Sequence, residues 1–93
     1  MDRKTLEYME ERATKARGIV NRIERLLDQV EQVKRARGVM DLYTRHKTIR
    51  LEMKYNELAE NNYTTEVVAA INNAFVNVTL AEIRHLEQEL AEL

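Results

Sequence analysis

The residues with the clearest chemical potential form a basic run, Lys34 to Arg50, in a chain of 93 residues. The run contains six Lys/Arg and one His against a single acid, Asp41. Clustered cations neutralise phosphates, so such a run is typical of a nucleic-acid contact. The residues expected to contact a polyanion or an acidic partner are Lys34, Arg35, Arg37, Arg45, Lys47 and Arg50.

The same cations have a second interpretation, in which acids of the same chain balance them. Residues 12–50 carry eleven Lys/Arg against four acids, whereas residues 51–93 carry two against eight, and the whole chain has a formal net charge of -1. We expect the acidic half to face the basic corner. Nucleic-acid binding remains the alternative, although Tyr43 is the only aromatic residue in the run and a base-stacking platform needs several.

The sequence lacks the side chains that most often act as nucleophiles in catalysis. The chain has no Cys and no Ser, which excludes Ser and Cys triads as well as cysteine-based zinc sites. Its two glycines, Gly18 and Gly38, are too far apart to form a phosphate-binding loop. We therefore predict no catalytic residue, no cofactor and no enzymatic activity.

One short motif resembles a helical metal site. Glu82 and His85 form an E-x-x-H pair, and di-metal carboxylate proteins use two such pairs together with two further Glu. The favoured interpretation is an exposed helix in which His85 contacts Glu89 one turn later, because E-x-x-H matches are common in Glu-rich helices. No metal ligand is predicted.

The elements that position these residues follow from hydrophobic periodicity. Apolar residues at alternating spacings of three and four predict a long, coiled-coil-like helix over 2–37, which Gly38 ends. Such a helix would be about 53 Å long, whereas a compact domain of this size is about 32 Å across. The apolar residues on the part of the helix that extends beyond such a domain therefore need a partner. The apolar seam consists of Leu6, Met9, Ala13, Ala16, Val20, Ile23, Leu27 and Val30, broadened by Ile19, Leu26 and Val33.

Two further helices are predicted, over 41–60 and 65–92. Asp41 would cap the first of them, which carries apolar stripes on both sides and has His46 on an inward face. The second is apolar almost all round, which indicates a buried helix. Its Asn72 and Asn77 are expected to be buried polar residues that fix the register of the helices, and a polar ligand-binding hole is the alternative.

The absence of Pro and the presence of only two Gly favour an all-α fold. We predict one domain over 1–93, with three helices per chain, assembled as an intertwined homodimeric helical bundle. A buried His46 would make that association pH-dependent. The predicted oligomer interface consists of Leu6, Met9, Val20, Ile23, Leu27, Val30, Leu42, His46, Ile49, Met53, Ile71, Phe75 and Val78.

A long helix followed by two shorter ones, dimerised by intertwining, resembles the all-helical chorismate mutases. In that family Arg and Lys side chains hold a dicarboxylate, and later helices supply a Glu and a Gln. The resemblance implies an enzyme as a third functional alternative. The Arg-Glu pair that opens the family's second helix is replaced here by Thr44-Arg45-His46, and the residues of the right type are Arg22 or Arg25, Lys34, Glu52 and Gln88.

The leading hypothesis for function is a small non-enzymatic helical protein that self-associates, as a homodimer or a higher oligomer, and binds another protein as an interaction or regulatory module. No apolar segment follows Met1, so we expect no signal peptide and a cytoplasmic location. The longest uncharged stretch, residues 67–81, contains three Asn and is too short to cross a bilayer, so no membrane contact is expected.

Overall fold

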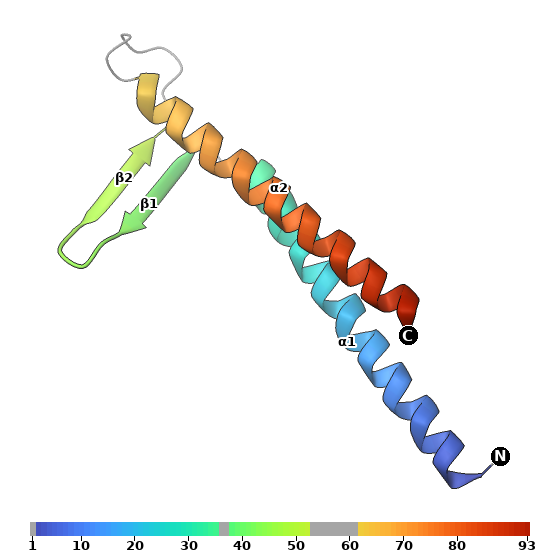
Figure 1. Cartoon of the computed structure of the whole chain (residues 1–93). Helices are drawn as coiled ribbons and strands as arrows, with labels where there is room; N and C mark the ends of the chain where they lie inside the picture. The colour runs from blue at the N-terminus through green and yellow to red at the C-terminus, as the bar shows by residue number, and fades with distance from the viewer. Residues whose placement is uncertain (1, 36–37, 53–61) are drawn as a thin grey trace.

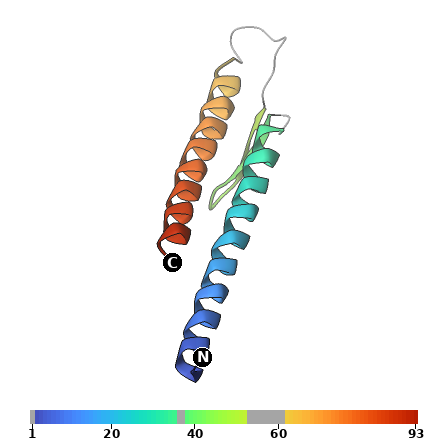
Figure 2. The same ribbon diagram turned by 90° about the vertical axis from the view of Figure 1, so that its right-hand side faces the viewer.

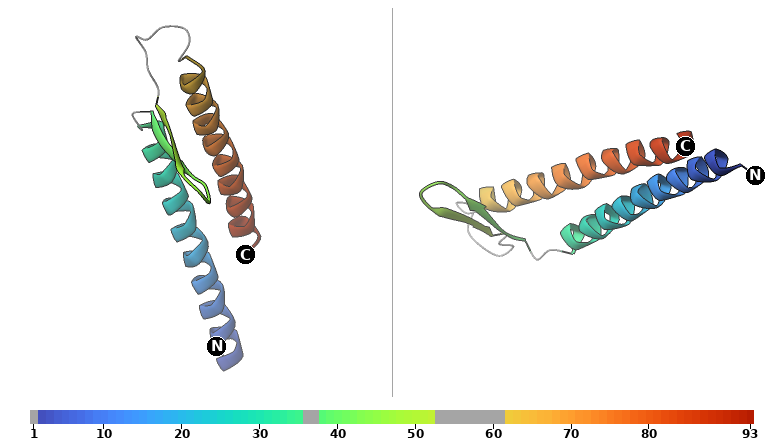
Figure 3. Two further views of the ribbon diagram at one scale, coloured as in Figure 1. Left: turned by 90° about the vertical axis from the view of Figure 1, so that its left-hand side faces the viewer. Right: turned by 90° about the horizontal axis from the view of Figure 1, so that it is seen from below.

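The computed structural model describes residues 2–35, 38–52 and 62–93, which form two long helices and one β-hairpin. Helix α1 spans Arg3–Lys34, strands β1 and β2 span Val39–Tyr43 and Thr48–Glu52, and helix α2 spans Asn62–Glu92. The helices run antiparallel, with both chain termini at one end and the hairpin at the other (Figures 1 and 3). The molecule is therefore mostly helical, but it is not a three-helix chain.

The bounds of α1 follow from local capping. Asp2 has an extended backbone, and its Oδ1 accepts a hydrogen bond from the Thr5 backbone N–H at 2.8 Å. This N-cap satisfies one of the free donors at the start of the helix. The helix ends at Lys34, and Gly38 then adopts a φ of 77° before β1 begins. Because L side chains avoid that backbone region, Gly38 suits the turn into the hairpin.

The two helices contact each other through heptad-spaced side chains. On α1 the buried or half-buried positions are Ala16, Ile19, Ile23, Leu26, Val30 and Val33. Among the buried or half-buried residues of α2, the heptad-spaced ones are Thr65, Ala69, Asn72, Val76, Thr79, Ile83, Leu86 and Leu90, and Leu93 directly after the helix continues the series. Both sets alternate spacings of three and four, which keeps one face of each helix towards its neighbour. The contact with α2 therefore combines the residues expected only to broaden the seam, Ile19, Leu26 and Val33, with Ala16, Ile23 and Val30 of the seam itself.

The predicted helix over 41–60 is wrong for residues 41–52, which form the hairpin instead. The strands pair antiparallel with Met40 opposite Leu51 and Leu42 opposite Ile49. Alternate residues of a strand share one face, so these four side chains form an apolar face and the intervening ones a polar face. Residues 53–60 of the predicted helix lie outside the described residues. The reason for the difference is that the seven-residue spacing of Leu42 and Ile49 suits a helix, whereas Met40 with Leu42 and Ile49 with Leu51 follow the period of 2 that a strand requires.

Thr44 organises the turn between the strands. Its hydroxyl donates to the Lys47 carbonyl at 2.6 Å and accepts from the backbone N–H groups of His46 and Lys47, at 3.3 and 3.0 Å. Its own N–H donates to the same carbonyl at 2.9 Å. The side chain thus stands in for backbone turn contacts, and the loop needs no Gly, Pro or Asn.

The hydrophobic core is small and the molecule is elongated. Val30, Leu51 and Val68 are buried on α1, β2 and α2, whereas Ile83 and Leu86 are buried further along α2. The radius of gyration is 20.3 Å and the molecule measures 72 × 27 × 16 Å. A compact chain of this length would have a radius of gyration of about 12 Å. The first turns of α1 extend past the end of α2 (Figure 2).

These features correct the predicted fold class. Three helices per chain were expected to intertwine with those of a second copy in an all-α bundle, whereas the described residues contain two helices that pack on each other and a two-stranded sheet. None of the described helices is long and apolar enough to cross a membrane.

Candidate functional site

The most prominent exposed apolar feature is a line of side chains along α1. Leu6, Met9, Val20 and Leu27 are 37% to 51% exposed, and Ala13 between them is also exposed. We call these five residues the α1 stripe. Helix α2 does not cover them because it packs on the neighbouring face of α1, through Ile19, Ile23 and Leu26. All of the α1 stripe except Ala13 belongs to the predicted oligomer interface.

A second apolar line lies on the outer surface of α2. Val67 and Phe75 are 37% and 38% exposed and Val78 is 70% exposed, while Ile71 is half-buried. The helix was expected to be apolar all round and hence buried, but only one face of it packs against α1. Ile71, Phe75 and Val78 are predicted interface residues that the fold leaves accessible.

The hairpin also presents an apolar surface that the rest of the chain covers only in part. Leu51 is buried where β2 contacts α2, and Met40 beside it is half-buried. Leu42 and Ile49, closer to the turn, are exposed. A two-stranded sheet alone is marginally stable in water, so the contact at Leu51 anchors the hairpin to α2.

The remaining predicted interface residues are distributed differently. Val30 is buried and Ile23 half-buried, both within the contact between α1 and α2. His46 was expected on an inward helix face, but it is exposed in the hairpin turn. The reason is that its neighbours Tyr43 and Thr48 are paired in strands. Met53 lies outside the described residues.

The basic residues do not gather at one corner. Lys34 and Arg35 lie at the end of α1, whereas Arg45 and Lys47 lie in the hairpin turn, which Figure 1 shows pointing away from the helices. Arg35 forms an ion pair with Glu31 at 3.7 Å. Arg37 lies outside the described residues.

The sixth cation, Arg50, pairs across the hairpin with Asp41. Its Nε lies 3.0 Å from Asp41 Oδ1 and its Nη2 lies 3.3 Å from Oδ2. This hydrogen bond lowers the pKa of Asp41 and raises that of Arg50. The acids seen beside Arg35 and Arg50 thus come from residues 31–41, whereas the acidic 51–93 half was expected to supply them. An ion pair that does join the two halves links Arg22 to Glu82 at 4.0 Å.

The two asparagines chosen from the sequence occupy different environments. Asn72 is half-buried at a heptad position of the contact between α1 and α2, where a polar residue can fix register. Asn77 is exposed, so the expectation that it is buried was wrong. Thr79, which sequence reasoning did not single out, is buried seven residues after Asn72 on the same face. The heptad spacing from Thr65 to Leu93 is the signal that would have identified it.

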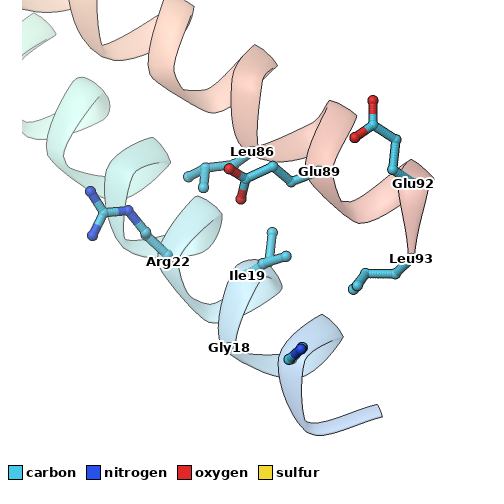
Figure 4. Close-up of a pocket in the computed structure, with 8 residues that line it drawn as sticks. Gly18, Ile19, Arg22, Leu86, Glu89, Glu92 and Leu93 are labelled. Carbon is cyan, nitrogen blue, oxygen red and sulfur yellow. The ribbon is translucent and has the colours of Figure 1, made fainter. Parts of the chain in front are cut away.

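A groove of about 620 Å³ opens between the helices near the C-terminus. Figure 4 shows Ile19 on α1, Leu86 on α2 and Leu93 directly after α2 lining it, with Arg22 and Glu89 close by. Gly18 is part of the α1 wall, and a Cβ built on it would meet no atom within 4 Å. The groove is open and shallow, and its charged side chains come from both helices.

The E-x-x-H pair does not form part of a metal site in the described residues. His85 Nε2 lies 3.1 Å from Glu89 Oε1, which is the contact predicted for an exposed helix. Glu82 instead contacts Arg22. Within the part of the chain that the structure describes, no three His, Asp or Glu side chains are grouped closely enough to hold a metal ion.

The resemblance to all-helical chorismate mutases is wrong, because it depended on the order of three helices and the described residues contain two. Glu52, the candidate glutamate, ends strand β2. Lys34 lies at the hairpin end of α1, whereas Gln88 lies near the C-terminal end of α2, and the antiparallel arrangement keeps these two ends apart (Figure 1). Comparison with protein-family models, with curated proteins and with solved structures finds no match for this chain.

Proposed function

We propose that this protein is a small non-enzymatic interaction module that self-associates through its exposed apolar helix surface and presents the hairpin to another protein. The observation that carries the proposal is the α1 stripe. Heptad-spaced apolar side chains exposed along several turns of a helix are the pattern with which helices pack on one another. In the described residues the fold supplies one helical partner for α1, and that partner occupies a different face.

The accessible surface of the chain supports the same proposal. It amounts to 7878 Å², whereas a compact folded monomer of 11.0 kDa exposes about 5,600 Å². The difference exceeds the roughly 800 Å² that each partner contributes to a standard interface. The exposed area includes the apolar side chains of the α1 stripe and of the outer line of α2. Association is the ordinary means by which such surface leaves water.

The small core is a further reason for a partner. Five hydrophobic residues are buried in the described part of the chain, namely Val30, Leu51, Val68, Ile83 and Leu86. A single domain of this size has little stability to spare, and the chain contains no Cys that could form a disulfide. Self-association would bury additional apolar area without any change in the fold of each chain.

The proposal is tested by replacing two α1-stripe residues with charged ones. The chain carrying Met9→Glu and Val20→Glu should be monomeric by multi-angle light scattering at concentrations where the unmodified chain is larger. The control carries Glu11→Gln and Asp28→Asn on the exposed surface of α1 and retains the apolar residues. Equal masses for the unmodified chain and the stripe variant would refute a role of the stripe.

Nucleic-acid binding is the second candidate, favoured by one observation. Arg45, His46 and Lys47 are consecutive and exposed in the hairpin turn. If phosphates are their target, binding to duplex DNA or RNA should fall steeply with salt and be weakened by Arg45→Ala with Lys47→Ala. A flat salt response would remove this candidate.

A further inference from the structure

We infer that the α1 stripe binds the same stripe of a second copy, with the two α1 helices antiparallel about a two-fold axis midway between Ala13 and Ala16. The inference rests on the proposed self-association and specifies its surface, orientation and register. It follows from the charges that flank the stripe, from the side chains along it, and from the position of α2.

The flanking charges alternate in sign with a heptad spacing. Arg3, Glu10, Arg17 and Glu24 are seven residues apart and exposed, and they follow one edge of the α1 stripe. Glu31 continues the series without alternating, but in the inferred register it lies beyond the start of the partner helix and faces none of its residues. In an antiparallel pair of helices, residues at this heptad position face the same position of the partner. Each Arg3 would then face Glu24 of the second copy, and each Glu10 would face Arg17. All four contacts, counted over both copies, join opposite charges.

Other arrangements of the same two helices bring like charges together. Moving the antiparallel register by one heptad in one direction places Arg3 against Arg17 and Glu10 against Glu10. Moving it in the other direction places Glu10 against Glu24 and Arg17 against Arg17. A parallel pair would place Arg17 beside Arg12 of the second copy. Like charges at such positions oppose pairing, so the flanking charges favour the inferred register over those one heptad away and over a parallel pair.

The apolar side chains fit that register. Met9 would pack against Val20 of the second copy, and Ala13 against Ala16, on both sides of the axis. Ala16 is half-buried and lies between the α1 stripe and the side chains that face α2. Small residues at the centre allow the two helices to approach closely, while Met9 and Val20 supply apolar area beyond it. The exposed fractions of Met9 and Val20, 51% and 37%, would fall on association.

Helix α2 leaves this contact accessible. At 100° per residue, the α1 stripe lies about 90° around the helix axis from the side chains that face α2. The groove lined by Gly18 and Arg22 lies on the opposite side of α1 from the stripe. In addition, the first turns of α1 extend past the C-terminal end of α2, so a partner helix that approaches these turns meets no second helix of the same chain (Figure 2).

The existing contacts of the flanking charges are weak enough to be exchanged. Arg3 Nε lies 3.5 Å from Glu7 Oε1 one turn later, and the Arg3 side chain is 92% exposed. Exposed pairs of this kind contribute little to stability, so exchanging Glu7 for Glu24 of the second copy costs Arg3 little.

Charge reversal tests the register. Glu10→Arg should weaken self-association at least tenfold at low salt, because it places Arg beside Arg17 at two symmetric contacts. Arg17→Glu should do the same, and the chain carrying both substitutions should recover to within about threefold. The matched control is Glu11→Arg, which changes the net charge equally on the far side of α1. Failure of the double variant to recover would overturn the proposed register.

Disulfide trapping tests the orientation, since the natural chain has no Cys. A chain carrying Ala13→Cys is mixed with a chain carrying Ala16→Cys and oxidised. The antiparallel pair predicts disulfides mainly between the two different variants, whereas a parallel pair would link each variant to itself. Like-with-like linkage, or none in a protein that associates, overturns this inference alone. A strictly monomeric protein overturns the proposed self-association as well.

Discussion

The guanidinium of Arg50 contacts both carboxylate oxygens of Asp41 across the hairpin, with Nε to Oδ1 at 3.0 Å and Nη2 to Oδ2 at 3.3 Å. The two residues are directly opposite in the strand register. Such a bidentate pair fixes register as well as adding attraction, because a slip by one residue would separate them. The pair lies on the polar face of the hairpin and leaves the opposite apolar face free.

The first prediction concerns the pH dependence of the hairpin. Because Arg50 lowers the pKa of Asp41, the contact contributes stability that is fully present above the ordinary pKa of Asp, about 3.9. That contribution is lost as pH falls through the lowered pKa of Asp41. Amide hydrogen exchange in β1 and β2 should therefore lose protection, relative to α1, as the solution is acidified below about pH 4.

Asp41→Asn should remove this part of the pH dependence, because the amide does not titrate. Asp28→Asn on α1 serves as the control and should leave the exchange of the hairpin unchanged. If hairpin protection in the Asp41→Asn chain showed the same dependence on pH as in the unmodified chain, Asp41 would not be the group responsible.

A second prediction concerns the turn. Thr44→Val keeps the shape and β-branching of the side chain but removes the hydroxyl that contacts His46 and Lys47. The hairpin should be destabilised by about 1 kcal/mol, the usual net value of a hydrogen bond in water. Thr44→Ser retains the hydroxyl and should have a clearly smaller effect. Chemical shifts of β1 and β2 report the change, and equal losses in both variants would show that the hydroxyl is unimportant.

The third prediction compares two apolar residues of α2. Ile83 is 3% exposed in the contact with α1, whereas Val78 is 70% exposed on the outer surface. Ile83→Ala should lower the free energy of unfolding by roughly 2–5 kcal/mol through lost burial and the cavity left behind. Val78→Ala should change it by less than about 0.5 kcal/mol. Urea denaturation measures both, and similar losses would indicate that the helices pack through different faces.

The fourth prediction concerns Gly18, whose added Cβ would meet no atom within 4 Å. Gly inside a helix costs about 1 kcal/mol relative to Ala, so Gly18→Ala should stabilise the protein by up to that amount. Thermal unfolding followed by circular dichroism measures the gain. A loss of stability instead would mean that a second copy or a partner packs closely over this position.

The sequence was sufficient to predict both long helices and the apolar line of α1. Heptad spacing can be read from the sequence alone. The helices predicted from it over 2–37 and 65–92 agree with α1 and α2. The sequence does not decide which face of α1 packs on α2, because α1 has two adjacent apolar lines. Only the structure shows that Ile19 and Leu26 contact α2 while Val20 and Leu27 remain exposed.

The hairpin could not be predicted with the same reasoning. Its turn, Thr44 to Lys47, contains none of the usual turn residues, and the Thr44 side chain replaces them. Leu42 and Ile49 are seven residues apart, which suits a helix, and they pair across a turn only when Tyr43 and Thr48 are already opposite. Whether these residues form strands or a helix therefore depends on contacts with residues elsewhere in the chain. Single-residue propensities carry no information about such contacts.

The central claim is that the α1 stripe makes this chain self-associate, and sedimentation equilibrium of the unmodified protein tests it most directly. Over a wide concentration range at low salt, the weight-average mass should approach a multiple of 11.0 kDa, and it should decrease on dilution and in the Glu10→Arg variant. A mass of 11.0 kDa at every concentration would contradict the account.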